Sequence, residues 1–344
     1  MAYTDIDNPS DYFSATLYTA NGTARTIATG HQSDWVWLKR RDGAAGHRIA
    51  DSVRGANKLL YSDSTTSEQS ASNTITGFVS TGFTLGDDSG GYDVNTSSNT
   101  MVAWSWKAGG SASSNSDGST TSSVSAGNTQ GFSIVSWTGT GSATTVGHGL
   151  GAVPKFIIVK NRDTARNWNV YYADETDYLQ LNDTSATTDN DNKWNDTAPT
   201  SSVFTVNTSS DTNKSGDAMI AYCFADVKGY SKFGSYTGNG SATNGVYIHL
   251  GFKAAWFMCK RTNASGHDWV IFNNKALGYN VDNNTLLANS SAAEGTADRM
   301  DILSNGVKMY NNNGSENESG GSYIYMAFAE SPFTNSNGIP NNAR

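Results

Sequence analysis

The charged residue that recurs most regularly in this chain is a lysine that closes an apolar run. It occurs three times, as Lys39, Lys160 and Lys260, which open "KRRD", "KNRD" and "KRTN". Such cations could contact acidic glycans or a neighbouring subunit. The alternative, which we prefer, is a strand end that enters solvent, where the long side chain also covers an apolar edge. Lys160 and Lys260 are nevertheless retained as candidate ligand contacts.

Aromatic side chains are the second resource for binding. Trp168 and Trp269 follow two of the three lysine-ended runs. Exposed tryptophans would form a platform for sugars, with loop Asn, Ser and Thr to match hydroxyl groups, although tryptophan in a small β-sandwich is more often a core residue. Trp194 differs because its surroundings, "DNDNKWNDT", are wholly polar. We therefore predict that Trp194 is exposed, and take Trp194, Trp168 and Trp269 as candidate ligand-binding residues.

Constellations typical of enzymes and metal sites are missing from the sequence. No histidine has a second histidine or a cysteine at metal-ligand spacing, and Cys223 and Cys259 are predicted to be core thiols. The acidic turns "TTDNDNKWND" and "GDDSGGYD" lack the glycine and terminal glutamate of a helix-loop-helix calcium site. Solvated turns are the preferred interpretation, with a loop-bound Ca²⁺ left open. Without paired strand carboxylates or a Gly-x-Ser-x-Gly elbow, the sequence predicts no enzyme, no cofactor and no metal.

These residues lie within a pattern that is written three times. "LYTANGTARTIATGHQSDWVWLKRRD", "SWTGTGSATTVGHGLGAVPKFIIVKNRD" and "SYTGNGSATNGVYIHLGFKAAWFMCKRTN" align Gly22, Gly141 and Gly240 at one position. Each copy ends in an aromatic-rich run: "MVAWSWK", "AMIAYCFA" and "YIYMAFA". Roughly a hundred residues per copy suits a small domain rather than a solenoid unit.

The pattern predicts a domain organisation. We expect a lead-in over 1–12, copies over 13–107, 131–228 and 231–330, and a tail over 331–344. The Gly/Ser/Thr-rich segment 108–130 has Val124 as its only large apolar residue, so we predict a flexible or extended linker there.

Composition and local pattern predict an all-β fold. Apolar residues make up 37% of the chain and charged residues 16%, and Gly, Ser, Thr and Asn favour short strands joined by turns. The run "FIIVK" is continuously apolar, as in a strand buried on both faces. Six or more strand candidates per copy fit antiparallel β-sandwich repeats in tandem, with a jelly-roll-like topology.

Charge and hydropathy exclude two classes of partner. The net charge of −8 argues against nucleic acid, because neutralising phosphates requires a dense basic face. No apolar run approaches the ~20 residues of a membrane-spanning helix. The start, "MAYTDIDNPSDYF", lacks the features of a secretory signal, so we expect synthesis in a cytoplasm without export.

The repeated blocks resemble a known group of sequences. "LYTANGTARTI", "YTGNGSA", "TGTGSATTVGHGLGAVPKFIIVKNRD", "AYCFADV" and "AFAESPF" are similar to repeats in virion surface proteins of tailed phages, especially marine phages, including tail-fibre-like proteins. The first copy departs from this pattern, since it lacks the counterpart of Pro154 and has a shorter loop.

The resemblance implies a phage virion structural protein. On this basis we expect a tail fibre or receptor-binding appendage at the virion surface, assembled in the cytoplasm of the host bacterium. Its partners would be other virion proteins and a host surface glycan or protein, in a homo-oligomer for which a trimer is the first expectation. A capsid decoration protein is the alternative, and a carbohydrate-binding module protein or depolymerase a more distant one.

Overall fold

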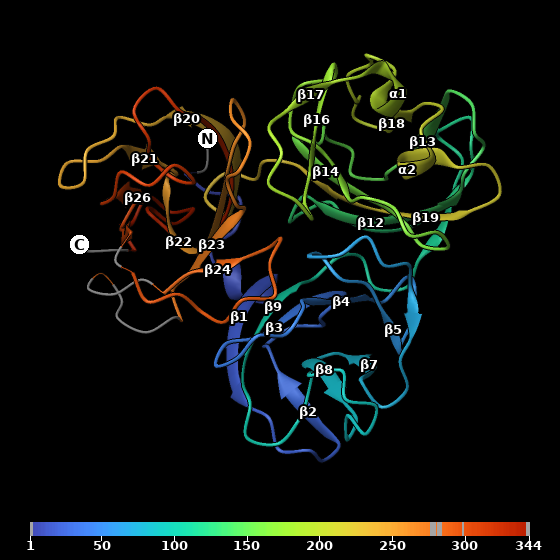
Figure 1. Cartoon of the computed structure of the whole chain (residues 1–344), viewed down its shortest axis with the longest axis horizontal. Helices are drawn as coiled ribbons and strands as arrows, with labels where there is room; N and C mark the ends of the chain where they lie inside the picture. The colour runs from blue at the N-terminus through green and yellow to red at the C-terminus, as the bar shows by residue number, and fades with distance from the viewer. Residues whose placement is uncertain (1–2, 276–279, 281–283, 298, 342–344) are drawn as a thin grey trace.

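The structure, a computed structural model, describes residues 3–275, 280, 284–297 and 299–341. It is all-β and contains several antiparallel sheets, as the sequence predicts (Figure 1). Among the described residues, helical structure is limited to three short pieces: η1 (Pro9–Asp11), α1 (Asp191–Trp194) and α2 (Ser210–Asn213). None of the helices in the described ranges is long and apolar enough to cross a membrane.

Three principal sheets surround a common junction (Figure 1). The first sheet has the order β1-β9-β3-β4, the second β10-β11-β12-β19-β14-β15-β16-β17 and the third β20-β27-β22-β23-β24. Their strands are β1 (Phe13–Thr19), β3 (Trp35–Arg40), β4 (Arg48–Asp51), β9 (Thr100–Trp106), β10 (Ser113–Asn115), β11 (Ser122–Gly127), β12 (Phe132–Thr138), β14 (Phe156–Asn161), β15 (Asn169–Tyr171), β16 (Asp177–Gln180), β17 (Thr188–Asp189), β19 (Ala218–Phe224), β20 (Ser231–Thr237), β22 (Phe252–Arg261), β23 (Val270–Asn273), β24 (Leu286–Leu287) and β27 (Ser322–Pro332).

Each principal sheet is covered on its outer face by a smaller sheet. The cover sheets are β2-β8-β7 on the first, β13-β18 on the second and β21-β26-β25 on the third, and a separate pair β5-β6 lies beside the first. Their strands are β2 (Arg25–Ala28), β5 (Lys58–Leu59), β6 (Gln69–Ser70), β7 (Ile75–Val79), β8 (Gly82–Leu85), β13 (Thr144–Gly147), β18 (Val203–Val206), β21 (Tyr247–His249), β25 (Met300–Leu303) and β26 (Gly306–Met309).

The lysine-ended strands are buried on both faces. In β14 every residue is buried; Ile157 and Val159 face the outer core under the cover sheet, whereas Phe156 and Ile158 face a core shared by all three principal sheets. Because side chains alternate along a strand, only a continuously apolar run can fill both cores. The prediction from "FIIVK" is confirmed.

The three principal sheets use the same order of corresponding strands. The strand that comes last in sequence, β9, β19 or β27, is inserted between the opening strand, β1, β12 or β20, and the lysine-ended strand, β3, β14 or β22. All of these pairings are antiparallel. In each sheet, the strand that comes last in sequence therefore pairs with two strands that lie much earlier in the chain.

Aromatic rings fill the shared core, which we call the central core. Trp35 of the first sheet stacks on Tyr222 of the second, with ring centroids 4.6 Å apart, and Phe13 stacks on Phe328 of the third at 5.3 Å. Trp256 meets Trp106 edge to face at 5.7 Å. Rings of this size bury large apolar areas, so the central core joins the sheets into one packed body.

A buried asparagine holds the glycine turn that the sequence repeats. The Asn213 side chain accepts a hydrogen bond from the amide of Thr140 at 2.9 Å and donates to the carbonyl of Ser142 at 2.7 Å. The backbone carbonyl of Asn213 accepts the amide hydrogen of Gly141. Asn95 and Asn317 make the corresponding contacts with their own turns. Gly141 has φ +73°, a conformation that glycine adopts without strain.

Segment 108–130, which its composition predicts to be a flexible or extended linker, is partly extended in the structure but belongs to a sheet. It contains β10 and β11, and β11 pairs with β12 from Ser123↔Ser136 to Gly127↔Phe132. Val124 is buried in the outer core of the second sheet. The polar strands are stabilised by ladder hydrogen bonds along an existing sheet, which composition alone does not reveal.

The described parts of the lead-in and tail lie against each other. The Asp7 carboxylate accepts hydrogen bonds from the amide and hydroxyl of Ser336, and Asp5 donates its amide to the carbonyl of Lys228. Residues 1–2 and 342–344 of these two predicted segments lie outside the described residues.

We expect Asn213→Ala to lower the free energy of unfolding by about 3 kcal/mol, because it leaves buried backbone groups of the turn without partners. Chemical denaturation measures the loss. The control is Asn128→Ala, since the exposed Asn128 also donates to two carbonyls, of Gly149 and Leu150, that can return to water. It should cost less than about 1 kcal/mol; equal losses would contradict the turn-holding role.

Candidate functional site

The three candidate tryptophans are core residues. Trp168 and Trp269 are fully buried and donate their indole N–H to the carbonyls of Tyr61 and Gln180, at 2.7 and 2.8 Å. Trp194 is only 2% exposed, and its indole N–H donates to the carbonyl of Asp177 at 3.1 Å. The predicted exposure of Trp194 is therefore wrong.

The polar neighbours of Trp194 serve to build a short helix. The Asn190 side chain caps α1 by accepting the amide hydrogen of Asn192, and Asn195 ends it with φ +56°. Asparagine is favoured at both of these positions for local backbone reasons. The polar sequence thus indicates capping, while the tryptophan at the end of α1 packs edge to face against Tyr171.

The candidate lysines are also buried, so the expectation that they enter solvent is wrong. The Lys160 ammonium donates to the carbonyls of Thr65 and Asn161, at 3.1 and 2.9 Å. The Lys260 ammonium donates to the carbonyls of Thr184 and His267, at 3.3 and 2.9 Å. Burial lowers the pKa of each to about 8.

These buried donors join neighbouring sheets in a closed cycle. Lys160 reaches from the second sheet to Thr65, in the part of the chain that forms the first, and Lys260 reaches from the third sheet to Thr184, in the part that forms the second. Lys39 completes the cycle, from the first sheet to Ser291 in the third part. We call the three contact regions seams. The lysines therefore contact a neighbour, but within the same chain.

At two seams an indole N–H donates directly to a carbonyl of the neighbouring part, whereas at the seam between the first and third parts a histidine lies between the two groups. Trp37 donates its indole N–H to Nδ1 of His47 at 2.7 Å, and Nε2 of His47 lies 2.9 Å from the carbonyl of Leu287. Burial, with Lys39 nearby, lowers the pKa of His47 to about 3. The neutral ring relays one hydrogen bond across the seam.

Ion pairs reinforce two of the seams. Arg162 pairs with Glu68 at 2.9 Å and Arg41 with Glu294 at 2.7 Å. A backbone hydrogen bond is present at all three seams: Glu68, Thr187 and Glu294 donate their amides to the carbonyls of Arg162, Thr262 and Arg41, respectively.

The other chemically capable side chains are used to hold structure. Cys223 and Cys259 are buried free thiols whose pKa is raised by burial, as expected of core thiols. The Asp88 carboxylate accepts the amide hydrogens of Val94 and Asn95, at 3.0 and 3.1 Å. Across the described ranges no group of three or more His, Cys, Asp or Glu is placed to hold a metal ion.

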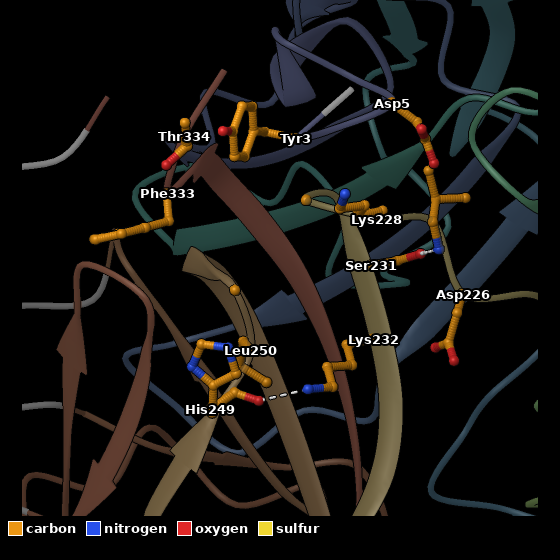
Figure 2. A pocket seen from close by; sticks show the side chains of 13 residues that line it. Tyr3, Asp5, Asp226, Lys228, Ser231, Lys232, His249, Leu250, Phe333 and Thr334 are labelled. Carbon is orange, nitrogen blue, oxygen red and sulfur yellow. Dashed lines mark hydrogen bonds between the residues drawn. The ribbon is translucent and has the colours of Figure 1, made fainter. Parts of the chain in front are cut away.

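An open pocket lies where the two ends of the described chain meet the third sheet. Its cavity is about 630 Å³, and we call it the terminal pocket (Figure 2). Its lining comes from the lead-in, the turn before β20, the end of β21 with the loop that follows, and the tail: Tyr3, Asp5, Asp226, Val227, Lys228, Gly229, Ser231, Lys232, His249, Leu250, Gly251, Phe333 and Thr334.

Two exposed aromatic side chains form one side of this pocket. Tyr3 is 62% exposed and Phe333 is 39% exposed, and Figure 2 shows both beside Thr334. The backbone beneath each is fixed. Thr4, next to Tyr3, donates its hydroxyl to the carbonyl of Lys228 at 2.9 Å, and the amide of Phe333 donates to the carbonyl of Gly251 at 3.2 Å.

Polar groups form the remaining sides. The Lys232 ammonium donates to the carbonyl of His249 at 2.7 Å (Figure 2), and Oδ1 of Asp226 accepts the amide hydrogen of Phe233 at 2.9 Å. Gly229 lies at φ +78°, and a Cβ there would stand 2.0 Å from the Thr4 hydroxyl oxygen. A glycine is thus needed for the lead-in to approach the pocket.

Sequence reasoning did not find the residues of the terminal pocket. Tyr3 lies in the predicted lead-in and Phe333 in the predicted tail, far apart in sequence and outside the repeated pattern. The available signal was the presence of aromatic residues in two otherwise polar end segments.

Comparison with protein families gives one match. The model of a family described as a domain of unknown function (DUF7483) matches residues 8–332. The chain belongs to this family. The match spans the three principal sheets and ends just before Phe333, so the pocket of this DUF7483 chain combines family and flanking residues. Neither the curated proteins nor the solved structures contain a match.

We expect Trp194→Ala to lower the free energy of unfolding by about 3–5 kcal/mol, because it leaves a cavity in a packed core. Tyr3→Ala, which removes an exposed ring, should change it by less than about 0.5 kcal/mol. Denaturant titration compares the two variants. A negligible loss for Trp194→Ala would indicate that this ring is at the surface.

The buried Lys160 predicts a pH dependence of stability. Between its folded pKa of about 8 and its ordinary value near 10.5, the unfolded chain holds a proton that the folded chain lacks, so stability rises with pH there. We expect the free energy of unfolding of the natural protein, relative to Lys160→Met, to rise by at most about 1.4 kcal/mol per pH unit between pH 8 and 10. The contributions of other titrating groups to the pH dependence cancel in this difference. A difference that does not change with pH would refute the lowered pKa of Lys160.

Proposed function

We propose that this chain is a structural protein of a tailed-phage virion, a tail fibre or receptor-binding appendage that attaches the particle to the host surface. The observation that carries the proposal is the terminal pocket, an open cavity with two exposed aromatic side chains. Binding pockets combine such apolar surface with a few placed polar groups. The resemblance of the repeated blocks to phage virion surface proteins supplies the biological context.

The proposal includes three tandem β-sandwich repeats, of jelly-roll-like topology, as the scaffold. Three observations support it: the shared strand order, the asparagine that holds each glycine turn and the cyclic lysine contacts. Since the seams are closed within one chain, assembly with other virion proteins or into a homo-oligomer uses the outer surfaces. Attachment needs no chemical step, so the proposal assigns no enzymatic activity, and a glycan-release assay should stay at background.

A capsid decoration protein is the second candidate, and one observation favours it. The three sheets contact each other in a cycle, which matches a lattice position of local three-fold symmetry. Such a protein would bind the capsid rather than a cell.

Cryo-electron microscopy of particles that carry the chain separates these candidates. Density at the tail periphery, with the terminal pocket facing outward, is the expected result. Density spread over the head lattice would replace the attachment function with decoration, and absence from purified particles would contradict both. Antibody labelling of an epitope inserted at the exposed residue Val153 provides an independent location.

A further inference from the structure

We infer that the terminal pocket binds a neutral saccharide, with Tyr3 and Phe333 as the stacking surface. This inference rests on the proposed attachment function, since it names the chemistry of the receptor and the residues that recognise it.

The two aromatic rings are exposed, and hydrogen bonds hold the chain at or beside each of them. Tyr3 precedes Thr4, whose hydroxyl donates to the carbonyl of Lys228, and the Tyr3 ring lies against Gly338, where a Cβ would come within 3.0 Å of the ring. The backbone of Phe333 is held at both ends, because its amide donates to the carbonyl of Gly251 and its carbonyl accepts from the amide of Asn341 at 3.0 Å. A ring on a held backbone loses only side-chain entropy when a flat apolar ligand face packs on it.

The fixed charges of the pocket are balanced. Asp5 and Asp226 contribute two carboxylates, and Lys228 and Lys232 contribute two ammonium groups. A site for an acidic glycan would need an excess of cations to compensate for desolvating the ligand's charge. The most regular cations of the sequence, Lys160 and Lys260, are buried at seams and cannot supply it. The balance favours an uncharged ligand.

Hydrogen-bonding groups of both kinds line the same pocket as the rings. The exposed carboxylate of Asp226 and the imidazole of His249 can accept from hydroxyl groups, while the ammonium of Lys232 and the hydroxyl of Thr334 can donate to them. A sugar ring combines an apolar face with a rim of hydroxyl groups, which matches this arrangement. A cavity of about 630 Å³ falls within the size range of small-ligand pockets.

The experiment uses the full chain and neutral tetrasaccharide probes: maltotetraose, cellotetraose and the β1,4-linked N-acetylglucosamine tetramer. Saturation-transfer NMR detects binding and calorimetry measures Kd, with tetragalacturonate as the acidic comparison. Tyr3→Ala and Phe333→Ala should each weaken binding about tenfold. Leu17→Ala is the matched control, because Leu17 is 39% exposed like Phe333 and lies on the first sheet. Circular dichroism checks the fold of every variant.

Binding of a neutral probe that is weakened about tenfold in both pocket variants and unchanged in Leu17→Ala supports the inference. Binding unchanged by the pocket variants, preference for tetragalacturonate, or no binding of any neutral probe at millimolar concentration overturns it. Adsorption of labelled protein to host cells is measured in parallel. Adsorption without neutral-saccharide binding overturns the inference and leaves the attachment function standing. Saccharide binding that depends on the pocket, without adsorption to cells, supports the inference and contradicts the attachment function.

Discussion

The central core is the constraint on which the rest of the structure depends. Three sheets can share one aromatic core only if each is apolar on both faces, since the outer face already packs under a cover sheet. This requirement explains why Trp35 and Trp37 alternate with Val36 and Leu38 in β3. It also means that the lysines that end these strands lie in a dry environment, where an ammonium group needs oxygen acceptors.

The seams satisfy that requirement. A strand that ends in the packed interior brings a lysine whose ammonium needs oxygen acceptors, and the loop of the neighbouring part brings carbonyls that need donors. The ammonium group and the carbonyl groups therefore satisfy each other's hydrogen-bonding requirements. The contacts run from second to first, third to second and first to third, so each of the three parts gives one lysine contact and receives one. We infer from this that unfolding of the described body is cooperative across all three sheets.

Much of this fold could be predicted from sequence because it rests on alternation and turn chemistry. The apolar run of Phe156–Asn161 indicates a strand buried on both faces, and the recurring glycine indicates a positive-φ turn. The seams could not be predicted, because a lysine after an apolar run has the same local sequence whether the strand ends in solvent or against a carbonyl. Trp194 shows the same limit: its asparagine neighbours cap a helix, and local polarity does not report tertiary burial.

The terminal pocket lies apart from the three seams. The lead-in and the tail contact each other there, and the lead-in also contacts the turn before β20. Tyr3 and Phe333 belong to neither core and are exposed. Substitutions in the lead-in and the tail at these positions therefore do not disturb a seam. Recognition placed on Tyr3 and Phe333 could change ligand through substitutions that leave the stability of the three sheets unaltered.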